Sequence, residues 1–213
     1  ERPSSWRRYK RLTRSALTAS GVLSPICHKI TVPQMITVAG AYGQRGAGVR
    51  KLCIVIGMSQ KSDPIQLRWA QGEVFSCDKR FRVLVAGRRF GKSYLSCVEL
   101  LRGAINRPGE TFFYCAPTYR MAKDIAWRAL KKLVPKIWIK SKNETDLRIE
   151  LINGSMIELK GTENAMALRG RSLSGVVLDE AAFMDAEVWF EVIRPALADK
   201  EGWALFISTP DGT

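Results

Sequence analysis

The chain has 213 residues, 46% of them hydrophobic, which is enough for one α/β domain of ordinary size with some chain to spare. No apolar run approaches the ~18 residues of a membrane-spanning helix, so no membrane partner is predicted. The net charge of +14 indicates a polyanionic partner, nucleic acid first, and the alternative is a surface that merely leans positive. Five cysteines without a C-x-x-C pair, beside a single histidine, argue against a zinc site and suit reduced thiols in a cytosolic protein.

Residues 1–57 differ in composition from the remainder of the chain. They carry ten Lys and Arg but only one acidic residue, Glu1, and the next acid is Asp63. Met58 opens a segment with ordinary mixing of charges. We interpret 1–57 as a basic extension that is not native or is disordered, placed before an ATPase domain at 58–213. A basic arm that binds DNA and an N-terminal targeting peptide are the alternatives.

From residue 58 onward, strand and helix patterns alternate. Strands are predicted over 81–86, 111–116, 175–178 and 203–208. Helices are predicted over 92–105, 118–133 and 186–197. The segment 147–159 is typical of a hairpin, because Asn153-Gly154 stands between two alternating apolar runs. Such alternation predicts an α/β fold with a mostly parallel sheet and helices on both faces.

A phosphate-binding loop is predicted between the first strand and the first helix, in VLVAGRRFGKS at Val83–Ser93. Backbone N–H groups of such a loop surround phosphates, Lys92 reaches the β and γ oxygens, and Ser93 offers a hydroxyl to Mg²⁺. One position departs from the common pattern, because Ala86 stands where the first glycine belongs. An ordinary glycine turn is the alternative, and the flanking strand and helix argue against it.

Two later strands end in residues that suit the same chemistry. In GVVLDEAA, at Gly175–Ala182, Asp179 can hold Mg²⁺ through water and Glu180 can orient and deprotonate an attacking water. In LFISTPDG, at Leu205–Gly212, Ser208 and Thr209 can sense the γ-phosphate. Taken alone, the two acids could be solvated turn residues, and the two hydroxyls could simply cap the turn that follows a strand. The phosphate-binding loop upstream favours the catalytic interpretation.

From about Ile65 to Thr213 the chain closely resembles the large terminase subunit of tailed bacteriophages, the ATPase that drives DNA packaging. The resemblance rests on AGRRFGKS with its missing first glycine and on three further segments, APTYRMAKDIAW (Ala116–Trp127), LRGRSLSGVVLDEAAF (Leu168–Phe183) and ISTPDG (Ile207–Gly212). It implies the RecA-like additional-strand (ASCE) P-loop NTPase fold. It also implies that Asp179 and Glu180 form the Walker B pair and that Ser208-Thr209-Pro210 is the coupling motif.

The resemblance assigns roles by position. The catalytic set is Glu180, Lys92, Arg88 and Arg169, and the metal ligands are Ser93 and Asp179. The nucleotide contacts are Gln71, Gly87, Arg88, Arg89, Phe90, Gly91, Lys92, Ser93 and Thr209. Gln71 resembles the family's adenine-contacting glutamine, with an exposed helix residue as the alternative, and Arg88 its phosphate sensor or cis-acting arginine finger. Arg169 lies near an arginine that reaches a neighbouring subunit's nucleotide; Arg171 and a plain surface salt bridge are the alternatives.

The implied function is an ATP- and Mg²⁺-dependent motor subunit that packages double-stranded viral DNA into a procapsid. Implied partners are the portal protein, the small terminase subunit and further copies in a homo-oligomeric ring, at the procapsid portal in the bacterial cytoplasm. The family's nuclease domain would follow Thr213, so we expect no nuclease activity from this chain and weak ATP hydrolysis by the chain alone. The alternatives are a helicase-like nucleic-acid-dependent ATPase and an inactive truncated assembly fragment.

Overall fold

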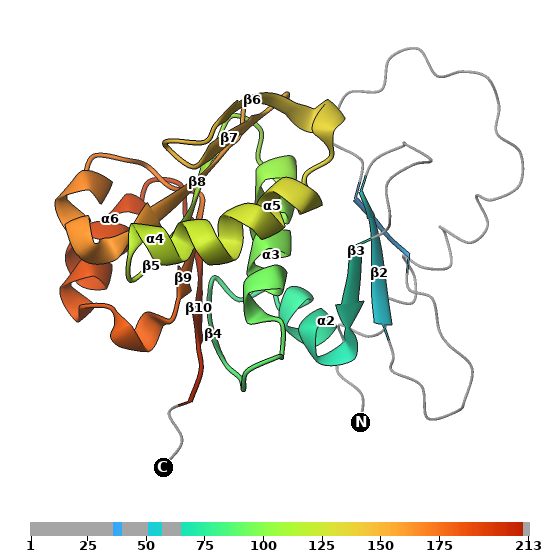
Figure 1. The fold of residues 1–213 in the computed structure, drawn as a ribbon, viewed down its shortest axis with the longest axis horizontal. Helices are drawn as coiled ribbons and strands as arrows, with labels where there is room; N and C mark the ends of the chain where they lie inside the picture. The colour runs from blue at the N-terminus through green and yellow to red at the C-terminus, as the bar shows by residue number, and fades with distance from the viewer. Residues whose placement is uncertain (1–35, 40–50, 57–64, 211–213) are drawn as a thin grey trace, which may run out of the picture. The chain divides into compact units, whose positions relative to one another are not determined.

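The computed structural model describes residues 36–39, 51–56 and 65–210, which divide into two units between Glu73 and Val74 (Figure 1). The N-terminal unit holds an antiparallel sheet of β1 (Ile36–Ala39), β2 (Lys51–Ile56) and β3 (Ile65–Arg68), in that order. Neither β1 nor β2 was predicted. The domain start predicted at Met58 lies outside the described residues, as does most of the basic extension. Helix α2 (Trp69–Phe75) follows β3 and continues into the second unit.

The second unit is built on a seven-stranded sheet in the order β4-β10-β9-β5-β8-β7-β6. Its strands are β4 (Phe81–Val85), β5 (Thr111–Ala116), β6 (Ile139–Asn143), β7 (Arg148–Leu151), β8 (Met156–Gly161), β9 (Gly175–Asp179) and β10 (Trp203–Ser208). The five strands from β4 to β8 in this order run parallel, which confirms the predicted sheet. Strand β10 lies between β4 and β9.

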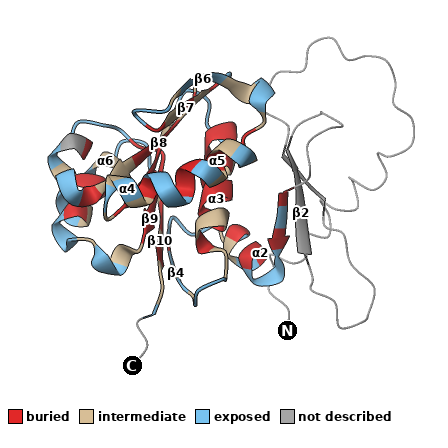
Figure 2. Ribbon diagram, in the orientation of Figure 1, coloured by how far each residue is buried: buried red, intermediate tan, exposed pale blue. Residues whose placement is uncertain are grey.

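Helices cover both faces of this sheet, as predicted (Figures 1 and 2). One face carries α3 (Lys92–Asn106) and a continuous helix made of α4 (Tyr119–Ala122), the π-helical η3 (Lys123–Trp127) and α5 (Arg128–Leu133). The other face carries η7 (Val188–Ile193) and α6 (Arg194–Ala196). The remaining turns are the short helices η4 (Lys136–Trp138), η5 (Thr162–Leu168) and η6 (Ala181–Phe183).

Strand β5 shows why the two faces form. Its side chains alternate, so that Phe113 and Cys115 pack with Val188 and Val192 of η7 on one side. On the other side Phe112 meets α3 at Gly103, where an added Cβ would lie 2.7 Å from the ring. Every residue of β5 after Thr111 is buried, which matches a central strand of a parallel sheet.

The predicted hairpin is present as the antiparallel pair β7–β8. The turn differs from a two-residue Asn-Gly turn, because Leu151 N donates to Ser155 O at 2.9 Å and closes a loop over 152–154. Gly154 takes the left-handed conformation there, with φ of 82°. The edge strand β6 was missed: its sequence, IKSKN, lacks apolar alternation, and its lysines suit an edge that must not pair with another chain.

A buried ion cluster joins the strand and helix on either side of the predicted loop. Glu99 of α3 is fully buried and lies 2.9 Å from Nη1 of Arg82, a β4 residue that is also buried. Arg102 of α3 binds the other carboxylate oxygen of Glu99. Removing one member of such a group is costly, because it leaves the remaining charges buried without a counter-ion.

We expect Glu99→Gln to lower the free energy of unfolding by about 3 kcal/mol, because Arg82 would remain buried without a counter-ion. Urea denaturation followed by circular dichroism measures this change. Glu150→Gln is the matched control, since it breaks an exposed pair with Lys140, and it should leave the unfolding free energy unchanged. Equal decreases in the free energy of unfolding would show that the buried cluster stabilises the fold no more than an exposed ion pair does.

Among residues 65–210, Cys97 and Cys115 are buried free thiols, and burial raises the pKa of each to about 12. Both are therefore protonated at neutral pH. No cluster of three or more His, Cys, Asp or Glu side chains suited to a metal occurs among the described residues. Within that same part of the chain, no helix has the length and apolar character to cross a membrane.

Candidate nucleotide-binding site

The predicted loop connects β4 to α3 and occupies residues 86–91. Arg89 and Gly91 both take left-handed backbone conformations, with φ of 68° and 86°, and Gly91 precedes the first residue of α3. The loop is tied to the coupling segment, because Ala86 N donates to Ser208 O at 3.2 Å. The N-terminus of a 15-residue helix at the end of this loop favours anions, since its first N–H groups lack intrahelical partners.

Lys92, the first residue of α3, points back into the loop. Its side chain is almost completely buried, and Nζ donates to Ala86 O at 2.7 Å and to Thr209 Oγ1 at 2.9 Å. A weaker contact of 3.4 Å reaches Gly87 O. The ammonium therefore lies inside the ring of loop atoms, where it can exchange these acceptors for phosphate oxygens.

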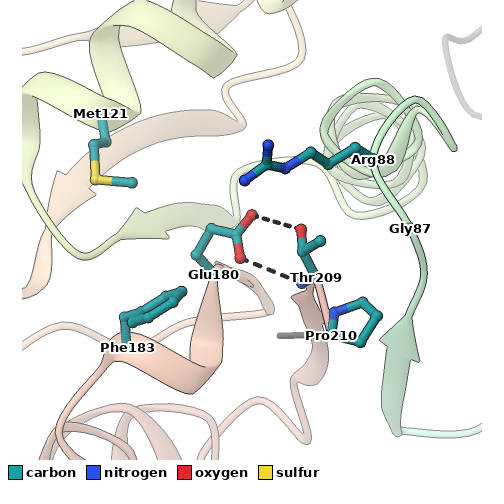
Figure 3. Close-up of a pocket in the computed structure, with 7 residues that line it drawn as sticks. All are labelled: Gly87, Arg88, Met121, Glu180, Phe183, Thr209 and Pro210. Carbon is teal, nitrogen blue, oxygen red and sulfur yellow. Dashed lines mark hydrogen bonds between the residues drawn. The ribbon is translucent and has the colours of Figure 1, made fainter. Parts of the chain in front are cut away.

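Glu180 follows the last residue of β9 and is held by Thr209. Its carboxylate accepts a bond from Thr209 N at 3.3 Å and one from Thr209 Oγ1 at 3.0 Å, as Figure 3 shows. The backbone of Glu180 is left-handed, with φ of 51°, a conformation that a non-glycine residue holds only where its surroundings enforce it. Thr209 thus connects the loop lysine to the acid on the neighbouring strand.

Asp179 ends β9 and is almost completely buried. Its Oδ2 accepts a bond from Ser93 Oγ at 3.4 Å and one from the Tyr114 hydroxyl, and its Oδ1 accepts Glu180 N at 2.9 Å. Burial raises the pKa of Asp179, while the hydrogen bond from Tyr114 acts in the opposite direction. Hydroxyl and carboxylate oxygens that already lie in contact suit Mg²⁺, so Ser93 and Asp179 fit the predicted metal site.

Glu180 and Thr209 line a pocket of about 510 Å³, a size suited to a small-molecule ligand. It is lined by Gly87, Arg88, Met121, Glu180, Phe183, Thr209 and Pro210, and the Arg88 guanidinium extends into it between α4 and Glu180 (Figure 3). Four of the predicted site residues therefore meet at one pocket, namely Gly87, Arg88, Glu180 and Thr209. Arg89, Phe90, Gly91, Lys92 and Ser93 lie in the adjoining loop and at the start of α3.

The two candidate trans-acting arginines, Arg169 and Arg171, have different ionic partners in the structure. Both line one second pocket, of about 470 Å³, which is distinct from the pocket lined by Glu180 and Thr209. Arg169 donates from Nη2 to Glu191 Oε2 at 3.3 Å, and both side chains of this pair are at least half exposed. Arg171 instead lies 3.7 Å from Oε1 of Glu158, a buried carboxylate whose other oxygen binds Lys160 at 2.7 Å.

Gln71 lies in the N-terminal unit, on α2. Its side-chain oxygen accepts a bond from Arg68 N at 2.8 Å, which is the arrangement of a capping box at the start of that helix. The residue is buried, so the alternative of an exposed helix glutamine is wrong. Its contact with adenine stays a prediction.

The sequence interpretation gave no role in the site to three of its residues, Met121, Phe183 and Tyr114. Met121 and Phe183 line the pocket together with Pro210 of the coupling motif, but they carry no group that marks them in a sequence. Tyr114 was the residue with a signal: it is the one hydroxyl-bearing ring in the strand TFFYCA, among residues that otherwise fill the core. A buried tyrosine needs a hydrogen-bond partner, and here the partner is Asp179.

Comparison with known proteins agrees with this geometry. Residues 83–213 match the family described as "Terminase large subunit, T4likevirus-type, N-terminal". The large terminase subunit of Thermus virus P23-45 is 34% identical over 150 residues, which cover 62% of this chain and 31% of that protein. The corresponding subunit of Escherichia phage T5 is 34% identical over 141 residues, with the same coverage. The chain thus spans about a third of the length of these relatives.

Solved structures show the same fold. The large terminase ATPase domain of Thermus phage P74-26 superposes with a TM-score of 0.60 at 30% identity, over 67% of this chain and 64% of that one. The HK97 bacteriophage large terminase, 17% identical, shares the fold with a TM-score of 0.57 over 70% of this chain and 34% of its own. The sheet order, the loop and these similarities identify a RecA-like P-loop fold. The chain belongs to the terminase large subunit family of the T4likevirus type, of which it carries the N-terminal region.

Proposed function

We propose that this chain binds ATP at the loop of residues 86–93 and hydrolyses it in a Mg²⁺-dependent reaction. The observation that carries the proposal is the meeting of Lys92 and Glu180 on Thr209, at the mouth of a pocket of nucleotide-binding size. The similar domain from Thermus phage P74-26 is named an ATPase domain, which supports the same assignment.

Each residue of the site then has a defined task. Backbone N–H groups of the loop and the ammonium of Lys92 bind the phosphates. Ser93 and Asp179 would hold Mg²⁺, which neutralises charge that develops on the β and γ oxygens. Glu180 orients a water on the γ-phosphate and accepts its proton. Arg88, which extends into the pocket, stabilises the negative charge that spreads over the phosphoryl oxygens in the transition state.

We further propose that hydrolysis drives the packaging of double-stranded viral DNA into a procapsid, in a homo-oligomeric ring. Portal protein and small terminase subunit are the proposed partners, and the procapsid portal in the host cytoplasm is the proposed place of action. Membership of the terminase family and a net charge of +14 support a duplex DNA substrate held through its phosphates. Nuclease activity is not part of the proposal for residues 1–213.

The decisive experiment measures ATP turnover by the chain with and without Mg²⁺ and with and without double-stranded DNA. We expect turnover that requires Mg²⁺, rises when DNA is added, and falls to background in Lys92→Ala. The same samples are tested for strand separation of a forked duplex. Turnover that survives Lys92→Ala would contradict the site, and strand separation coupled to hydrolysis would favour a helicase over a packaging motor.

A further inference from the structure

Tyr114 occupies a position next to the proposed metal site that its strand alone does not explain. It lies on β5, opposite Val177 of β9, and it is fully buried. Its hydroxyl extends along the sheet to the end of β9 and donates to Oδ2 of Asp179. The residue before it, Phe113, is buried without any polar group. Phenylalanine would fill the space at 114, so the hydroxyl itself requires an explanation.

The hydroxyl completes a set of three donors around the Asp179 carboxylate. Glu180 N donates to Oδ1 at 2.9 Å, while Ser93 Oγ and the Tyr114 hydroxyl both donate to Oδ2. Such bonds fix the orientation of a carboxylate that would otherwise rotate about its Cβ–Cγ bond. Outer donors of this kind orient metal ligands in many sites, and their loss typically weakens metal affinity about 10–100-fold.

Tyr114 and Ser93 differ in what happens when a cation binds. Ser93 is itself a proposed ligand, so its oxygen would give a lone pair to the metal while its one O–H is the group that donates to Asp179. Tyr114 is not a proposed ligand, and its fully buried hydroxyl has the Asp179 carboxylate as its acceptor. The bond from Tyr114 therefore holds Asp179 independently of how Ser93 contacts the cation.

We propose that Tyr114 is a positioning residue for the divalent cation, holding the Asp179 carboxylate toward Ser93 and so increasing the affinity of the site for the metal. This inference rests on the proposed function. It adds a residue from a third element, strand β5, to a metal site built from helix α3 and strand β9.

The test is Tyr114→Phe, with Mn²⁺ as the probe cation and ADP as the nucleotide. Electron paramagnetic resonance measures free Mn²⁺ during a titration of the protein–ADP complex. We expect the Kd for Mn²⁺ to rise about tenfold, while ADP binding measured in EDTA stays unchanged. Tyr119→Phe is the matched control: it removes a tyrosine hydroxyl that donates to Thr145 O, and its Kd for Mn²⁺ should equal that of the wild type.

A double-mutant cycle separates positioning from packing. In an Asp179→Asn background, adding Tyr114→Phe should change the Kd for Mn²⁺ no further, because the carboxylate that it positions is gone. An equal loss in both backgrounds would overturn the inference, as would a wild-type Kd in Tyr114→Phe. If the wild type with ADP binds no Mn²⁺ at all, the proposed Mg²⁺-dependent reaction fails first and this inference fails with it.

A second measurement covers the case in which Tyr114→Phe does not fold. 3-Fluorotyrosine incorporated at position 114 places a ¹⁹F label beside the hydroxyl. We expect its resonance to shift when Mg²⁺ is added with ADP, and to stay fixed in the Asp179→Asn protein. A resonance that ignores Mg²⁺ in the otherwise wild-type protein would contradict the role.

Discussion

Glu180→Gln is expected to lower the rate of ATP hydrolysis by about 10²–10⁴-fold while ATP binding is retained. Glutamine keeps the shape of the side chain and can still accept the bond from Thr209 N, so the pocket should remain intact. It has no basic oxygen, however, and cannot take a proton from the attacking water. Single-turnover hydrolysis of radiolabelled ATP measures the rate, and equilibrium binding of a fluorescent ATP analogue measures affinity.

The matched control for this substitution is Glu187→Gln. Glu187 is an exposed acid in the same segment after β9, and it does not line the pocket. Its replacement should leave both rate and affinity at wild-type values. A fast Glu180→Gln enzyme would show that another group activates the water, and loss of ATP binding in Glu180→Gln would show that the acid supports the pocket instead.

Thr209 connects Glu180 to Lys92 at the phosphate-binding loop. In the structure, Thr209 Oγ1 accepts a bond from Lys92 and donates one to Glu180. When Lys92 turns to a phosphate, Thr209 loses one of these two partners. We therefore expect phosphate binding at the loop to affect the position of Glu180 through this one hydroxyl. The same residue belongs to the segment that the resemblance assigned to coupling.

Much of this arrangement could be predicted from the sequence, for a physical reason. Parallel strands place their carboxyl ends at one edge of a sheet, so a loop after β4, acids after β9 and hydroxyls after β10 must converge. The apolar strands of the core and the Asn153-Gly154 turn could also be predicted, because buried strands and a glycine in a left-handed turn have recognisable local sequence patterns.

The parts that escaped prediction depend on contacts between distant segments. The pocket-lining role of Met121 arises only when α4 packs on β5 and β8, and nothing near Met121 in the chain encodes it. The bond between Tyr114 and Asp179 joins residues on neighbouring strands, 65 positions apart. Strand β6 pairs with β7 through backbone groups and through polar contacts to Glu150, and its polar side chains give no strand pattern.

Arg169 and Arg171 differ in how firmly the structure holds each side chain, a difference that the sequence does not show. A residue that leaves its resting place to reach a neighbouring subunit should be held weakly in the free chain. Arg169 meets this condition, because its pair with Glu191 is exposed and of little energetic weight. Arg171 faces the buried carboxylate of Glu158, which would lose a neighbouring cation if Arg171 left.

Arg169→Ala is therefore expected to lower turnover in the assembled protein by about 10³-fold, the scale of a lost arginine finger. Arg169→Lys should recover little, because an ammonium lacks the planar fork that binds two phosphate oxygens. Arg171→Ala should lower turnover far less, and only by shifting the loop that carries Arg169. Steady-state hydrolysis, measured over a range of protein concentrations, checks all three, and turnover per subunit should rise with concentration as subunits assemble.

A mixing experiment decides whether Arg169 acts in trans. Subunits with Arg169→Ala keep Glu180, and subunits with Glu180→Gln keep Arg169, so neither variant alone builds a complete site. In a ring whose interfaces are head-to-tail, random mixing of equal amounts restores about a quarter of the sites, those in which an Arg169→Ala subunit faces the arginine of a Glu180→Gln neighbour. If the arginine acted on its own subunit's nucleotide, every site in the mixture would lack one group, and turnover would stay at the level of the single variants.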